Sequence, residues 1–103
     1  MFSNVKSIEK KANFYFDGNV SSRTIHLNTG ERKTLGFMLK GEYLFNAGVE
    51  ELMEVLNGEM KIKLQGETEY SNFIQGTSFI VPENTSFNVI IDSFADYCCS
   101  YKD

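Results

Sequence analysis

Residues 76–87 of this chain of 103 residues read GTSFIVPENTSF. The stretch begins at Gly76, continues through a strand-length run with β-branched and aromatic residues, and reaches Pro82. A turn-like segment follows, and a new apolar run begins at Phe87. Proline is confined to the ends and edges of strands, and Pro and Asn both favour turns. The pattern therefore predicts two short strands joined by a tight turn.

Turn-favouring residue pairs recur along the whole chain, and the segments between them have the length of strands. The pairs are Asp17-Gly18, Thr29-Gly30, Lys40-Gly41, Asn57-Gly58, Gln65-Gly66 and Gln75-Gly76. Short strands separated in this way are typical of a sandwich or a barrel. We therefore predict an all-β, jelly-roll-like barrel over residues 12–103, preceded by an N-terminal arm over residues 1–11.

Two runs flank Asn57-Gly58, the pair that best tolerates the positive φ angles of a type I′ turn, so we predict a hairpin there. In the second run, Met60 and Ile62 share one face with Leu64, and charged residues occupy the other. The first run, ELMEVL, carries apolar residues on both faces. Because such a strand is usually covered on both sides, and this chain is short, we expect a homodimer.

The composition is that of a small globular domain without a basic field. Lys and Arg number 10 against 14 Asp and Glu, which gives a net charge of −4 and disfavours a nucleic-acid partner. No apolar run resembles a signal peptide or a membrane span, so we expect a cytoplasmic protein with no membrane partner. Cys98 and Cys99 are sequence neighbours, which strand geometry does not allow to pair without strain, so we expect free thiols.

GTSFIVPENTSF resembles the second signature of the cupin barrels, and ELMEVLNG keeps the glutamate-to-glycine spacing of the first. Metal-binding cupins carry a histidine where this chain has Phe87, and two more within the stretch that corresponds to residues 44–47. No histidine occurs at these places, and the only one in the chain is His26. Since zinc or iron needs three or four converging donors, we expect no metal and no other cofactor.

GFMLKGEYLF, EELMEVLNG, GTSFIVPENTSF and DYCCSY, in that order, closely resemble the pyrimidine/purine nucleoside phosphorylases, which are small single-domain cupins. The resemblance covers about residues 15–101. It implies a cupin-type barrel and a metal-independent phosphorolysis, in which a purine or pyrimidine nucleoside and phosphate give free base and pentose 1-phosphate. Two alternatives remain open: a non-catalytic cupin that binds a small nucleotide-like or sugar ligand, and a purely structural dimeric module.

Phosphorolysis needs a cation for the phosphate, and Arg32 is the first candidate because a guanidinium can bind phosphate through two parallel hydrogen bonds. Arg32 and the hydroxyl of Thr34 also match the family pattern. In a regular strand both would share a face with Gly36 and Met38, but the sequence does not decide whether this face lines the pocket or meets solvent. An exposed arginine in a turn is the alternative.

The reaction also needs a group to stabilise an oxocarbenium-like sugar and a surface for the departing base. Glu51 is the candidate carboxylate, for the ribose hydroxyls or the developing charge; its alternative is a structural pairing with an arginine. Stacking aromatics would accept any base. The candidates are Tyr43, Phe79, Phe87 and Tyr97, although most aromatics of a small barrel belong to its core.

Overall fold

The computed structural model describes residues 1–103 as one antiparallel β structure, which confirms the all-β prediction. The elements are β1 (Val5–Ile8), β2 (Asn13–Tyr15), the 3-10 turn η1 (Phe16–Gly18), β3 (Val20–Leu27), β4 (Arg32–Ala47), β5 (Glu51–Leu64), β6 (Ser71–Ile74), β7 (Ser78–Val81) and β8 (Thr85–Tyr101). The strand order is β1-β3-β4-β8-β5-β6, with β2 added to β3 and β7 added to β5. No helix has the length and apolarity that a membrane crossing requires.

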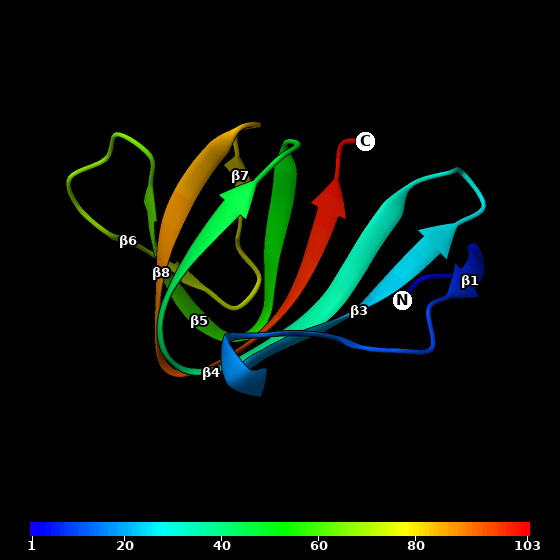
Figure 1. The fold of residues 1–103 in the computed structure, drawn as a ribbon, viewed down its shortest axis with the longest axis horizontal. Helices are drawn as coiled ribbons and strands as arrows, with labels where there is room; N and C mark the ends of the chain where they lie inside the picture. The colour runs from blue at the N-terminus through cyan, green and yellow to red at the C-terminus, as the bar shows by residue number, and fades with distance from the viewer.

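Three long strands give the molecule its shape. Figure 1 shows β4, β5 and β8 bending near the bottom of the view, so that one continuous sheet forms two facing walls. The bends coincide with irregular pairing between Leu39 and Gly41 of β4 and between Gly58 and Lys61 of β5. A bulge inserts an unpaired residue and bends the strand, which is how a sheet closes into a barrel without ending.

The Asn57-Gly58 hairpin prediction was wrong, because both residues lie inside the uninterrupted strand β5. Gly58 does adopt a positive φ of 78°, but it uses this conformation at a bulge and not in a turn. A Cβ at this position would lie 2.2 Å from the carbonyl oxygen of Phe94 on β8. Asn57 donates a hydrogen bond from Nδ2 to Asp96 Oδ2 at 2.7 Å. A glycine that tolerates positive φ therefore marks a bend here.

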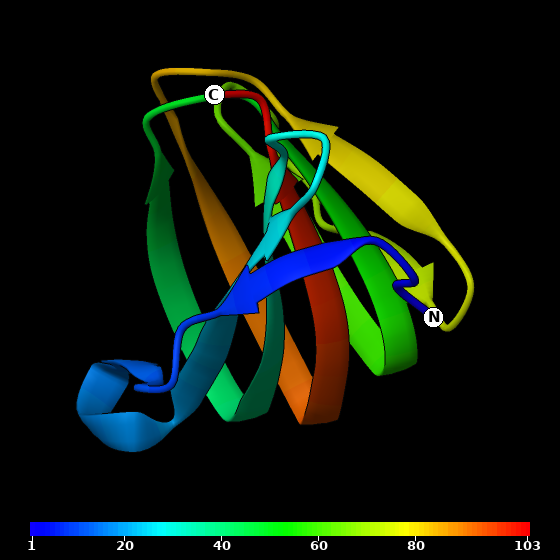
Figure 2. The ribbon, with the colours of Figure 1, turned by 90° about the vertical axis from the view of Figure 1, so that its right-hand side faces the viewer.

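The predicted turn at Pro82 is present between β7 and β8, where Asn84 has a φ of 56°. The expected arm, residues 1–11, contains β1. This edge strand pairs with β3, as Figure 2 shows from the side, and all four of its residues are exposed.

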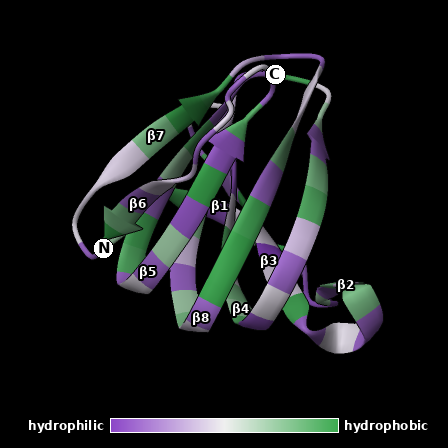
Figure 3. Cartoon of the chain, turned by 90° about the vertical axis from the view of Figure 1, so that its left-hand side faces the viewer, coloured by the Kyte–Doolittle hydropathy of each residue, from purple (hydrophilic) through white to green (hydrophobic).

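The core fills the space between the two walls with residues from alternate positions of each strand. Its most deeply buried large side chains are Met38, Met60, Ile62, Ile91, Val20, Val55, Val81 and Val89. In the wall seen in Figure 3, β8 carries an unbroken apolar stretch. Several core residues, among them Met38, Met53 and Tyr97, also line a pocket that remains within the barrel.

Candidate active site

Three neighbouring strands place Arg32, Tyr101 and Glu51 side by side. Arg32 of β4 is in register with Tyr101 of β8, and Tyr101 is in register with Glu51 of β5. Side chains at such cross-strand positions lie on the same face of a sheet. All three line one pocket in the barrel, and we call them the Arg32 row.

The pocket has a volume of about 250 Å³, and eight of its twelve lining residues are hydrophobic. Its lining residues are Tyr15, Ser22, Arg32, Met38, Phe45, Asn46, Glu51, Met53, Phe87, Tyr97, Cys99 and Tyr101. Apolar and aromatic walls with a few convergent polar groups are typical of small-molecule sites. The Arg32 row supplies both charged groups of this lining.

Arg32 is the first residue of β4, and its side chain is held from two directions. Its Nε and one terminal nitrogen donate hydrogen bonds to the two carboxylate oxygens of Asp103, at 2.8 and 2.9 Å. Its Cζ lies 3.8 Å from the centre of the Tyr101 ring. The hydrogen bond to Asp103 raises the pKa of Arg32 above its ordinary value and lowers that of Asp103. The guanidinium is therefore a fixed cation at the mouth of the pocket.

The structure also settles which face of this strand lines the barrel. Met38 lines the pocket and Thr34 is buried, whereas Leu35 and Phe37 are exposed on the opposite face. Thr34 does not line the pocket itself. Its hydroxyl lies 3.2 Å from the hydroxyl of Tyr101, within hydrogen-bonding distance.

Glu51 is half-buried at the start of β5, and its carboxylate has no ion-pair partner. Its one side-chain hydrogen bond comes from the thiol of Cys99, whose Sγ lies 3.6 Å from Oε1. Burial raises the pKa of Glu51, and the Cys99 contact and the charge of Arg32 only partly oppose this. The carboxylate therefore keeps acceptor capacity for a ligand. Burial also raises the pKa of Cys99, which stays a neutral thiol.

Tyr97 lies against β4 because residue 36 is a glycine. A Cβ on Gly36 would lie 2.5 Å from the Tyr97 hydroxyl oxygen and 2.6 Å from the carbonyl oxygen of Ser21. No side chain fits in this gap without a shift of backbone. Burial raises the pKa of Tyr97 well above that of a free tyrosine, so the phenol remains protonated and can donate a hydrogen bond.

The four aromatic candidates divide between the pocket and the core. Phe87 and Tyr97 line the pocket. Tyr43 is buried elsewhere and donates a hydrogen bond to the carbonyl of Leu39 at 2.7 Å. Phe79 of β7 packs against Phe73 at a centroid distance of 4.6 Å. Neither Tyr43 nor Phe79 reaches the pocket lining.

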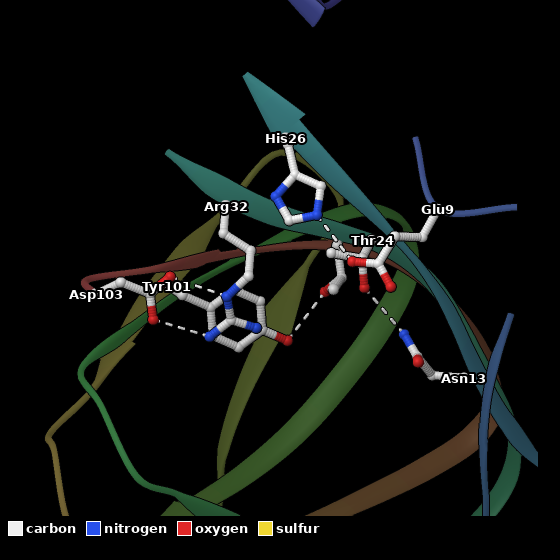
Figure 4. A network of polar contacts seen from close by, with 8 residues as sticks. Glu9, Asn13, Thr24, His26, Arg32, Tyr101 and Asp103 are labelled. Carbon is white, nitrogen blue, oxygen red and sulfur yellow. Dashed lines mark hydrogen bonds and ion pairs between the residues drawn. The ribbon is translucent and has the colours of Figure 1, made fainter. Parts of the chain in front are cut away.

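No histidine stands at the places of the cupin ligands: residues 44–47 are Leu, Phe, Asn and Ala, and residue 87 is Phe. Phe87 is in register with Phe45, and the two rings stack with centroids 5.6 Å apart. His26 lies away from them and pairs with Glu9 at 2.8 Å, as Figure 4 shows. No three His, Cys, Asp or Glu side chains come close enough together to hold a metal ion. The donor set at this pocket therefore does not fit a cupin metal.

Sequence reasoning missed several residues of the site, above all Tyr101. In DYCCSY, every second residue from Tyr97 lies on the same face of the strand. If Tyr97 lines the pocket, Cys99 and Tyr101 are therefore expected to face it as well. The same alternation in β3 brings Ser22 to the lining and Thr24 beside it. Both hydroxyls accept hydrogen bonds from the amide of Asn13, at 3.2 and 3.1 Å.

Known proteins resemble this chain over nearly its whole length. The family model described as pyrimidine/purine nucleoside phosphorylase matches residues 10–101. A protein of that name from Clostridioides difficile is 53% identical over 97% of this chain and 94% of its own length. A crystal structure of a DUF1255 protein of unknown function from Acinetobacter sp. ADP1 superposes with a TM-score of 0.94 and 36% identity, over 99% of this chain and 98% of the other.

More distant structures share the fold alone. An RmlC-like cupin from Shewanella frigidimarina superposes with a TM-score of 0.70 at 16% identity, over 88% of this chain and 81% of the other. The predicted cupin-type barrel is confirmed.

Proposed function

The chain belongs to the pyrimidine/purine nucleoside phosphorylase family, and we propose that its active site is the pocket behind Arg32. In the reaction, a phosphate oxygen bonds to C1′ of the nucleoside, the glycosidic bond breaks, and the departing base takes up a proton. The products are free base and pentose 1-phosphate. One observation supports this location most strongly: the Arg32 row places a cation and a half-buried carboxylate in a single pocket with aromatic walls.

Arg32 binds the phosphate nucleophile. A planar guanidinium presents paired donors that match two phosphate oxygens, and such charge-assisted bonds contribute about 1.5–3 kcal/mol each. The pairing with the Asp103 carboxylate shows that both donors can reach one anion. Thr34 acts on this site through the hydroxyl of Tyr101 and not by direct contact.

Glu51 faces the sugar. Its carboxylate accepts hydrogen bonds from ribose hydroxyls and stabilises the positive charge that develops as the glycosidic bond breaks. Its lack of an ion-pair partner supports this role, since a half-buried carboxylate gains most from a partner that the ligand supplies.

Phe87 and Tyr97 hold the base, together with Phe45, which stacks on Phe87. Stacking depends on a π face that every base has, whereas hydrogen bonds to base edges would select one base. An aromatic platform therefore suits an enzyme that accepts both purine and pyrimidine nucleosides.

The enzyme works as a homodimer in the cytoplasm. Leu52 and Leu56, on the outer face of β5, are 37% and 38% exposed, and they lie on the same side of the sheet as the stacked pair Phe37 and Phe94. Exposed apolar surface of this kind is usually covered by a partner. The two free cysteines fit a reducing compartment.

Release of free base from uridine, inosine and adenosine tests the function directly. The protein is treated exhaustively with a chelator and assayed with and without inorganic phosphate. We expect base release that requires phosphate and survives chelation. Absence of release with every nucleoside would contradict the enzymatic function and favour a binding protein. Loss of activity on chelation would contradict the metal-independent site.

A further inference from the structure

Arg32 and Tyr101 form the boundary between the pocket and a second, outer space. The outer groove has a volume of about 490 Å³ and is lined by residues that include Asp103, Lys102 and Glu50. Arg32 and Tyr101 are the two residues that line both spaces. An anion held by Arg32 at this boundary can enter from the groove and face a nucleoside in the pocket.

The guanidinium of Arg32 makes two contacts of different kinds. Its flat face lies over the Tyr101 ring, 3.8 Å from the ring centre to Cζ. Its edge donates two hydrogen bonds to Asp103 in the plane of the group. Figure 4 shows the ring behind the guanidinium and the carboxylate at its edge. The ring occupies the face of the guanidinium and not its edge donors. Another anion can therefore replace the Asp103 carboxylate at the edge while the contact with the ring is kept.

We propose that Tyr101 is a positioning residue, which holds the plane of Arg32 while phosphate replaces the Asp103 carboxylate at its edge. This inference rests on the proposed phosphorolysis. A carboxylate and a phosphate both present two oxygens to the fork of a guanidinium, so the geometry with Asp103 is that of the phosphate complex. The Arg32–Asp103 pair is partly exposed, with 36% and 49% of the side chains accessible, and exposed ion pairs exchange at little cost.

Tyr101 itself is fixed by the fold. It pairs with Arg32 on one side and with Glu51 on the other, and its hydroxyl contacts the buried hydroxyl of Thr34. A ring held in this way restricts the flexible side chain that lies over it. Arg32 is therefore ordered before phosphate arrives, and binding does not have to supply the free energy to order it.

The two contacts of Arg32 predict opposite effects on phosphate binding. Removal of the ring releases the guanidinium, so Tyr101→Leu raises the KM for phosphate about five- to tenfold. Removal of the competing charge favours phosphate, so Asp103→Asn lowers this KM about two- to fivefold. Tyr101→Phe keeps the ring and restores most of the phosphate affinity. A merely structural role of Tyr101 would change stability without this selective effect on phosphate.

The experiment measures base release against phosphate at saturating nucleoside and against nucleoside at saturating phosphate. Thermal unfolding with and without inorganic phosphate gives a second readout that does not need turnover. Matched controls are Tyr70→Leu, which removes an exposed tyrosine near Lys63, and Asp92→Asn, which removes the partner of Lys61. Both controls leave the KM for phosphate unchanged. If Tyr101→Leu does not fold, Tyr101→Met replaces it as the ring-deleted variant.

An unchanged KM for phosphate in a folded ring-deleted variant would overturn the inference, as would a raised KM in Asp103→Asn. A rise in the KM for nucleoside alone would also overturn it. If the wild-type protein releases no base, the proposed function fails. Phosphate-induced stabilisation of the wild type, reduced in the ring-deleted variant and increased in Asp103→Asn, would then still support the positioning role. Without phosphate-induced stabilisation of the wild type, the positioning role fails as well.

Discussion

The inner and outer faces of β4, β8 and β5 belong to the same strands but differ in chemistry. On the inner face, the Arg32 row gathers a cation, a phenol and a carboxylate around an apolar pocket. On the outer face, Leu35, Phe37, Phe94, Leu52 and Leu56 are exposed, and Phe37 stacks on Phe94 with centroids 5.8 Å apart. Neighbouring residues in the chain thus serve opposite faces, because successive side chains of a strand alternate.

This difference suggests a division of labour between the two faces of one sheet. We expect substitutions at inner positions to act on base release, and substitutions at outer positions to act on association with a second copy. A one-residue shift of register would exchange the two faces and abolish both. The predictions below test this separation, from the largest expected effect on activity to the smallest.

Arg32→Ala tests the cation of the inner face. Loss of two charge-assisted hydrogen bonds to phosphate lowers phosphate-dependent base release by about a hundredfold or more. The free energy of unfolding changes by less than about 1 kcal/mol, because the pair with Asp103 is partly exposed. Base release measured at varied phosphate concentration gives the change in activity, and thermal unfolding gives the change in stability. Arg23→Ala, at an exposed arginine on the outer side of β3, is the control and keeps full activity. Equal losses in both variants would contradict a phosphate site at Arg32.

Glu51→Gln tests the carboxylate. The amide keeps the size of the side chain but loses the negative charge, so base release falls about tenfold or more at neutral pH. Glu54→Gln, on the outer face of the same strand, is the matched control. Full activity of Glu51→Gln would show that the carboxylate is structural.

The pH dependence of stability offers a second test of Glu51. Its pKa is raised in the folded protein, mainly by burial, so the unfolded state releases this proton at a lower pH. The contribution of Glu51 to stability is therefore fully present below its unfolded pKa and is lost as pH rises through its folded pKa. The wild type should lose stability relative to Glu51→Gln across this window. Thermal unfolding from pH 4 to pH 8 measures it, and a difference independent of pH would contradict the raised pKa.

Phe37→Glu tests the outer face. A charge in the centre of the apolar surface disfavours its burial against a second copy, so the variant shifts from dimer to monomer in sedimentation experiments. Phe37 does not line the pocket, so kcat stays within about twofold of the wild type. Ile74→Glu, at an exposed residue on β6, leaves the dimer intact. A wild type that is monomeric at all concentrations would contradict the homodimer.

The sequence predicted the strands well but not their continuity. Periodicity of two placed Arg32, Thr34 and Met38 on one face, and the structure agrees. Whether this face lines the barrel or meets solvent depends on how the neighbouring strands pack. The residue pattern of a single strand carries no information about that packing. Asn57-Gly58 was taken for a turn because a positive φ at glycine serves a hairpin and a bulge equally.

The lining of the candidate pocket was only partly predictable from the sequence, because the packing of the core decides which side chains reach it. Glu51, Arg32, Phe87 and Tyr97 all line the pocket. Tyr43 and Phe79 look equivalent in sequence, yet they pack against other parts of the core, because aromatic residues favour both burial and binding. The Arg32–Asp103 pair joins residues 71 positions apart, and local sequence patterns do not predict a contact over that separation.

The continuity of β4 and β8 has a consequence for how the molecule folds and moves. β4 is 16 residues long and β8 is 17, and they pair along almost their whole length across both walls of the barrel. The two walls are therefore one cooperative unit that cannot open independently, and the strand pairing requires closure of a long intervening loop. We expect folding to be slow for a chain of this length. We therefore expect ligand entry to the proposed site to depend on side chains and loops at the mouth of the pocket and not on a hinge between the walls.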